Sequence, residues 1–112
     1  MSVERFTMET VSRYTPLTPG RNTIRKFSPK YHNMEPGDTL LMHYVDEDGK
    51  THGREKLIVR SIHVAHLDTL CLAHYRDNHG FHMQAPNVLR DFLLKCYPGT
   101  DTQEDTFIAI YV

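Results

Sequence analysis

The C-terminal run Thr106–Val112 (TFIAIYV) is the feature that most constrains the fold. It is apolar and rich in β-branched residues, without the polar alternation of a half-exposed strand. Such a run predicts a strand buried on both faces. It follows two stretches with helical character, so this strand must return to a sheet begun before the helices. The order predicts an α+β domain, a small β-barrel or sheet with two helices packed at one end.

Two runs ahead of the helices predict an antiparallel hairpin. Asp38–Val45 has the content of a buried strand, and Glu55–His66 alternates β-favouring with polar residues. The phase of the second run slips near Ser61, which predicts a bulge. The turn is expected at Asp46–Gly49, where the glycine can adopt a positive φ. A shorter strand is expected over Thr23–Phe27.

Two helices are expected between the hairpin and the last strand. Asp68 is a candidate N-cap for a helix over Thr69–Asn78, with Gly80 as the C-terminal stop. The second helix is expected over Pro86–Tyr97, because proline is favoured in the first helical turn. An apolar stripe at helical spacing supports it: Val88, Leu89, Phe92, Leu93 and Cys96.

The 112 residues suit a single domain. Residues 1–14 have no clean period and predict an N-terminal arm, so the domain is expected over residues 15–112. Charges occur throughout the first 14 residues, unlike a signal peptide. The sequence also contains no apolar run near the roughly 20 residues that span a bilayer. These observations predict a cytoplasmic protein without a membrane partner.

Charge is distributed unevenly along the chain. Residues 1–32 carry six basic and two acidic side chains, which gives +4, whereas residues 33–53 carry five acidic side chains and one basic, which gives −4. Such asymmetry can steer an anionic partner to one face, and scattered solvated charge is the alternative. The two cysteines, Cys71 and Cys96, have apolar neighbours and predict reduced core thiols.

Five short motifs follow one another along the chain. They are Gly20–Ile24 (GRNTI), Pro36–Asp38 (PGD), Asp46–Gly49 (DEDG), Leu67–Leu70 (LDTL) and Tyr97–Gly99 (YPG). In order and spacing they resemble the ASCH domain, and more narrowly the small bacterial acetylcytidine amidohydrolases. The resemblance covers Pro19–Val112. It implies a PUA-like β-barrel with flanking helices and a cleft that accepts RNA or modified nucleosides.

The resemblance also implies a catalytic lysine, threonine and glutamate, and this chain departs from all three. The motifs align Asn22 with the lysine, Arg25 with the threonine and Asn78 with the glutamate. Neither an amide nor a guanidinium can accept and return a proton. A binding module for RNA, a nucleoside or a nucleotide is therefore expected, with Tyr31 stacking on a base. The expected ligand-binding residues are Arg21, Asn22, Arg25, Lys26, Tyr31 and Asn78.

Two other classes of function stay open. A hydrolase of the acetylcytidine type, or a ribonuclease, could use a rearranged site, with Thr23, Lys26, His74 and Asp77 as candidates. A protein-interaction or inhibitor factor could instead present the acidic segments Asp46–Asp48 and Asp101–Asp105 to a basic partner.

Histidine is frequent, with eight in the chain. Four residues of zinc-binding type lie close together in the sequence: Cys71, His74, His79 and His82. Their spacing matches no standard zinc module, and geometry decides whether such residues converge. We favour a helix end with exposed histidines and one buried thiol, and we expect no metal and no cofactor.

Overall fold

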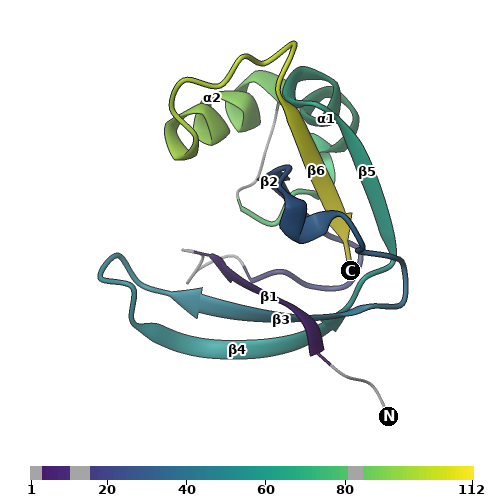
Figure 1. Ribbon diagram of the computed structural model, residues 1–112. Helices are drawn as coiled ribbons and strands as arrows, with labels where there is room; N and C mark the ends of the chain where they lie inside the picture. Colours follow the sequence, from purple (N-terminus) through teal and green to yellow (C-terminus); the bar gives the residue numbers. More distant parts are fainter. Residues whose placement is uncertain (1–3, 11–15, 81–84) are drawn as a thin grey trace.

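In the computed structural model, residues 4–10, 16–80 and 85–112 are described, and their six strands form two three-stranded sheets (Figure 1). The first sheet has the order β1-β3-β4 and the second the order β2-β6-β5. The strands are β1 (Glu4–Thr10), β2 (Asn22–Lys26), β3 (Thr39–Val45), β4 (Thr51–Ile58), β5 (Ser61–His66) and β6 (Thr106–Tyr111). The helices are α1 (Leu67–His74) and α2 (Pro86–Cys96), with short 3-10 turns η1 (Pro29–Tyr31) and η2 (Tyr75–Asp77).

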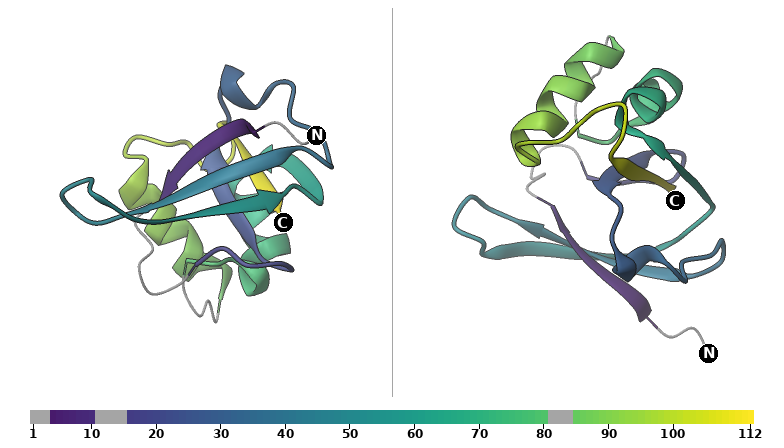
Figure 2. Two further views of the ribbon diagram at one scale, coloured as in Figure 1. Left: turned by 90° about the horizontal axis from the view of Figure 1, so that it is seen from below. Right: turned by 45° about the horizontal axis from the view of Figure 1, so that its top comes forward.

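The second sheet lies between the first sheet and the two helices, which gives three layers (Figures 1 and 2). Strand β6 shows why this order is stable. Ile108 and Ile110 join the core between the two sheets, whereas Phe107 and Ala109 join the core beneath the helices. Successive strand residues point to opposite faces, so one apolar run supplies both cores. The expected last strand, buried on both faces, is confirmed.

The N-terminal residues differ from the expected arm. Glu4–Thr10 form β1, which pairs in parallel with β3 at the edge of the first sheet. Met8 is buried in the core between the sheets, and Phe6 packs against that core. These two apolar residues are two positions apart and therefore face the same side of the strand. Burial of this pair holds the segment in the sheet.

The run Glu55–His66 is two strands in different sheets, and the single bulged strand expected from the sequence is wrong. The β3–β4 hairpin is confirmed, with Gly49 in its turn at φ 82°. After Ile58 the chain changes partners. Val59 is buried and exchanges backbone hydrogen bonds with Gly37 and Asp38, while the Arg60 N–H donates to the Tyr111 carbonyl of the second sheet. The phase slip marks this crossing.

The helices follow the sequence in part. Helix α2 matches the expected helix to within one residue. Helix α1 begins at Leu67 with His66 as its N-cap, so Asp68 lies in the first turn and is not the cap. There the Asp68 carboxylate accepts a hydrogen bond from the Thr102 hydroxyl. The helix ends at His74 and continues as η2. Neither helix in the described part has the length and apolarity to cross a bilayer.

The fold is α+β with two helices, as expected. The described strands do not close into a barrel, because no ladder joins edge strand β1 to edge strand β2. Side chains contact the edge of β1 instead: Arg25 of β2 donates to the Glu9 carbonyl, and Lys30 of η1 donates to the Thr7 carbonyl. We call this junction between β1 and β2 the seam.

Candidate ligand-binding site

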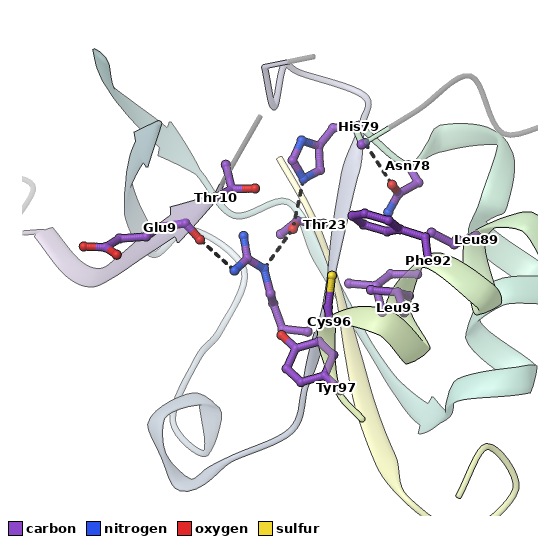
Figure 3. Close-up of a pocket in the computed structure, with 13 residues that line it drawn as sticks. Glu9, Thr10, Thr23, Asn78, His79, Leu89, Phe92, Leu93, Cys96 and Tyr97 are labelled. Atoms are coloured by element: carbon purple, nitrogen blue, oxygen red, sulfur yellow. Dashed lines mark hydrogen bonds between the residues drawn. The ribbon is translucent and has the colours of Figure 1, made fainter. Parts of the chain in front are cut away.

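A cavity of about 300 Å³ opens at the seam (Figure 3). One part of its lining is mostly polar and comes from the end of β1, from β2 and from residues 78–80. The opposite part is mostly apolar and comes from α2 and the residue after it. The polar part contains Glu9, Thr10, Thr23, Ile24, Arg25, Asn78, His79 and Gly80; the apolar part contains Leu89, Phe92, Leu93, Cys96 and Tyr97.

Arg25 on β2 lines this cavity, the position expected from its alignment. Its Nη1 donates to the Glu9 carbonyl at 2.7 Å, and its Nε donates to Thr23 Oγ1 at 3.2 Å. Both acceptors are neutral, and Arg25 has no carboxylate partner within the described part of the chain. A guanidinium has five N–H donors in a planar fork, so these two bonds leave donors for an anion.

Thr23 positions Arg25 from beneath. The two side chains share one side of β2 because they are two residues apart. Thr23 Oγ1 also lies 3.2 Å from His79 Nε2 (Figure 3). Thr23 is only 1% exposed, so a substrate carbonyl has almost no access to its hydroxyl. These hydrogen bonds favour a role for Thr23 in orienting Arg25 and His79 over a role as a nucleophile.

A buried pair of asparagines fixes the wall that carries His79. Asn78 Nδ2 donates to Asn22 Oδ1 at 3.1 Å, and Asn22 Nδ2 donates to the His74 carbonyl at 3.0 Å. The His79 N–H then donates to the Asn22 carbonyl. Asn22 is 0% exposed and does not line the cavity. Of the two asparagines expected to bind a ligand, only Asn78 reaches the cavity surface.

The other three expected binding residues lie elsewhere. Tyr31 is 7% exposed and packs in the core between the sheets, so it cannot stack on a base without leaving that core. Arg21 is exposed, and its Nη1 donates to the Arg76 carbonyl. Lys26 Nζ lies 3.9 Å from the Asp105 carboxylate. None of these three side chains lines the cavity.

The candidate catalytic residues are separated from one another. Thr23 lies under the cavity and Lys26 beside Asp105, whereas His74 and Asp77 both contact the Tyr111 hydroxyl. Their distances to it are 2.7 Å from His74 Nδ1 and 3.3 Å from Asp77 Oδ2. The four residues therefore do not form a single catalytic site.

His74 belongs to a second polar cluster, formed by His63, His74, Asp77 and Tyr111. The rings of His63 and His74 lie 4.5 Å apart, and each packs against the Tyr111 ring. Burial lowers the pKa of His74, and neighbouring His63 lowers it further, against an opposing effect of Asp77. Burial raises the pKa of Tyr111. We call this group the histidine cluster.

The four residues of zinc-binding type do not come together in the described part of the chain. Cys71 is buried beneath the helices, and burial raises the pKa of its thiol to about 12, which disfavours the thiolate that a metal requires. His74 lies in the histidine cluster and His79 at the cavity. His82 lies outside the described residues.

The acidic segments form turns. The Asp46 carboxylate accepts backbone N–H groups of Asp48 and Lys50 and contacts His52, which lowers the Asp46 pKa. In the other segment, Asp105 accepts the Asp101 N–H. These bonds account for the acidic residues locally, and whether the segments also contact a partner protein stays a hypothesis.

Sequence reasoning missed the apolar wall of the cavity. The apolar stripe on α2 supported only the prediction of a helix, and its Leu89 and Leu93 are buried. Phe92 and Tyr97 are only partly buried and lie on the flank that faces the seam. Only the placement of β1, which supplies Glu9 and Thr10, shows that this flank encloses a cavity.

No protein family, curated protein or solved structure matches the chain.

Proposed function

We propose that this chain is an ASCH-like binding domain that holds a nucleoside or nucleotide, free or within an RNA strand, in the seam cavity. One observation carries the proposal: the Arg25 guanidinium extends into a cavity whose other wall contains Phe92 and Tyr97, and it has only neutral acceptors within the described residues. A ligand with an anionic or carbonyl group and a planar ring would satisfy both walls.

The energetics favour such a ligand over a purely apolar one. Stacking of a base on an aromatic side chain contributes about 1–3 kcal/mol. A hydrogen bond to a charged donor such as Arg25 contributes about 1.5–3 kcal/mol. A cavity of about 300 Å³ lies at the lower end of the range for small-molecule sites. This size suits one base with part of its sugar.

The geometry supports the alignment behind the resemblance. Asn78 is far from Asn22 and Arg25 in sequence, yet it is hydrogen-bonded to Asn22 and lines the same cavity as Arg25. The proposed barrel is one that stays open at the seam, with both sheets contributing to one core. The opening gives a ligand access to the cavity, and this supports the expectation of a ligand cleft.

The hydrolase hypothesis has less support from the same geometry. Thr23 has a histidine neighbour, but its hydroxyl is buried and accepts a hydrogen bond from Arg25, which reduces its nucleophilicity. Incubation with acetylcytidine, followed by chromatography, separates the two hypotheses. Release of cytidine by the wild type and its loss in Thr23→Ala would show that a binding-only function is wrong.

Calorimetric titration with cytidine, cytidine monophosphate and a short single-stranded RNA tests the binding proposal. We expect the affinity for the charged ligands to fall as salt rises. Arg25→Gln should weaken cytidine monophosphate binding about tenfold or more. Arg21→Gln is the matched control, because this arginine lies outside the cavity. The proposal fails if none of the three ligands binds to the wild type at low salt.

A further inference from the structure

Two cations bind the same edge of β1. Arg25 Nη1 donates to the Glu9 carbonyl at 2.7 Å, and Lys30 Nζ donates to the Thr7 carbonyl at 2.8 Å. Alternate carbonyls of a strand point to the same side. Both cations therefore lie along the seam, one at the cavity and the other just outside its lining.

The spacing of these two contacts fits a phosphate group. Carbonyls two residues apart on a strand are separated by about 6.6 Å, because each residue advances the strand by about 3.3 Å. Two oxygens of one phosphate lie about 2.5 Å apart, and each accepts a charge-assisted hydrogen bond of about 2.8 Å. One phosphate can thus reach both cations, whose carbonyl acceptors lie at this separation, after movement of their flexible side chains.

The charges around Arg25 and Lys30 also favour binding of a phosphate. Neither Arg25 on β2 nor Lys30 in η1 has an ion-pair partner within the described residues, whereas Lys26 on β2 pairs with Asp105. Burial lowers the pKa of Lys30, and the nearby Arg25 lowers it further, against an opposing effect of Glu9. The Glu9 side chain is exposed and offsets only part of the positive charge.

We propose that Arg25 and Lys30 form a subsite for a phosphate monoester at the rim of the seam cavity. The inference rests on the proposed function and sharpens it, because it makes the ligand a nucleotide and not a nucleoside. On binding, the phosphate oxygens replace the backbone carbonyls of Glu9 and Thr7 as acceptors. The Arg25 and Lys30 side chains then no longer cover the outer carbonyls of edge strand β1.

Inorganic phosphate tests the subsite without relying on recognition of a base. We expect it to shift the NMR signals of the Arg25 Nε–H and the Thr7–Glu9 amides, with a dissociation constant of about 1 mM. Lys30→Gln and Arg25→Gln should each weaken this binding about five- to tenfold. Lys26→Gln is the matched control and should change it by less than about twofold.

Two results would overturn the subsite. One is an absence of seam shifts in the wild type, and the other is an equal effect of Lys26→Gln and Lys30→Gln. Titration with cytidine and its monophosphate separates this failure from that of the proposed function. Equal affinity for both ligands, unaffected by Lys30→Gln, refutes the subsite alone. If phosphate binds as expected but cytidine, its monophosphate and the short RNA all fail to bind, the proposed function is wrong and the phosphate site remains.

Discussion

The seam cavity and the histidine cluster lie beside the same strand, β2, yet they use their polar groups differently. In the histidine cluster, rings pack at 4.5–5.6 Å and the Tyr111 hydroxyl contacts both His74 and Asp77. At the seam, Arg25 has neutral acceptors and faces a cavity. The two regions therefore differ in how their polar groups are used. In the histidine cluster the polar side chains contact one another, whereas at the seam Arg25 keeps N–H donors for a ligand.

Asn22 links the two regions, so its removal should have the largest effect. It joins the carbonyl of His74 to the side chain of Asn78 from a fully buried position. Asn22→Ala leaves both of these groups without their partner, and we expect a loss of about 2–4 kcal/mol in the free energy of unfolding. Chemical denaturation measures it, with the exposed Asn33→Ala as control. A loss under about 0.5 kcal/mol would show that the regions are not coupled through Asn22.

Tyr111→Phe should affect the histidine cluster more than the seam. It keeps the ring contacts and removes the hydroxyl that bonds to His74 and Asp77 and also contacts the Asn22 side chain. We expect a loss of about 1 kcal/mol in stability, because one good hydrogen bond contributes about that much. Affinity for cytidine monophosphate should stay within about twofold of wild type. A variant with wild-type stability but weakened binding would reverse the roles given to the two regions.

The pH dependence of stability should carry a smaller effect from the histidine cluster. The folded state lowers the pKa of His74, so the unfolded chain takes up this proton first as the pH falls. The contribution of His74 is complete above its ordinary pKa of about 6.5 and declines as the pH falls below that value. Thermal unfolding between about pH 7.5 and pH 5 measures this decline.

His74→Gln should make the decline shallower, because it removes the group whose pKa is lowered in the folded state. A decline that becomes steeper in His74→Gln would contradict the lowered pKa.

The sequence predicted those elements whose own residues determine them. Thr106–Tyr111 and Pro86–Cys96 carry long apolar patterns, and both were found within one residue. Strand β1 was missed because Phe6 and Met8 alone are too short a pattern to distinguish a strand from an arm. The change of sheet at Val59 depends on partners from distant segments, which local periodicity does not record.

The same distinction between local sequence patterns and distant partners applies to the site residues. Arg25 and Asn78, two of the expected binding residues, line the cavity, and their positions were inferred from motifs near them in sequence. Tyr31 was placed in the ligand site because it is aromatic and lies in a loop, although the core between the sheets buries it. The sequence did not indicate roles for Lys30 and Phe92, because these roles depend on where β1 lies relative to β2 and α2 in the fold.

The central claim is that Arg25 serves a ligand and not the fold. The most direct test measures stability and cytidine monophosphate affinity together in Arg25→Gln, with Arg21→Gln beside it. We predict that unfolding free energy changes by no more than about 0.5 kcal/mol while affinity falls about tenfold or more. A large loss of stability with unchanged affinity would contradict this account, because Arg25 would then be a structural tie between β1 and β2.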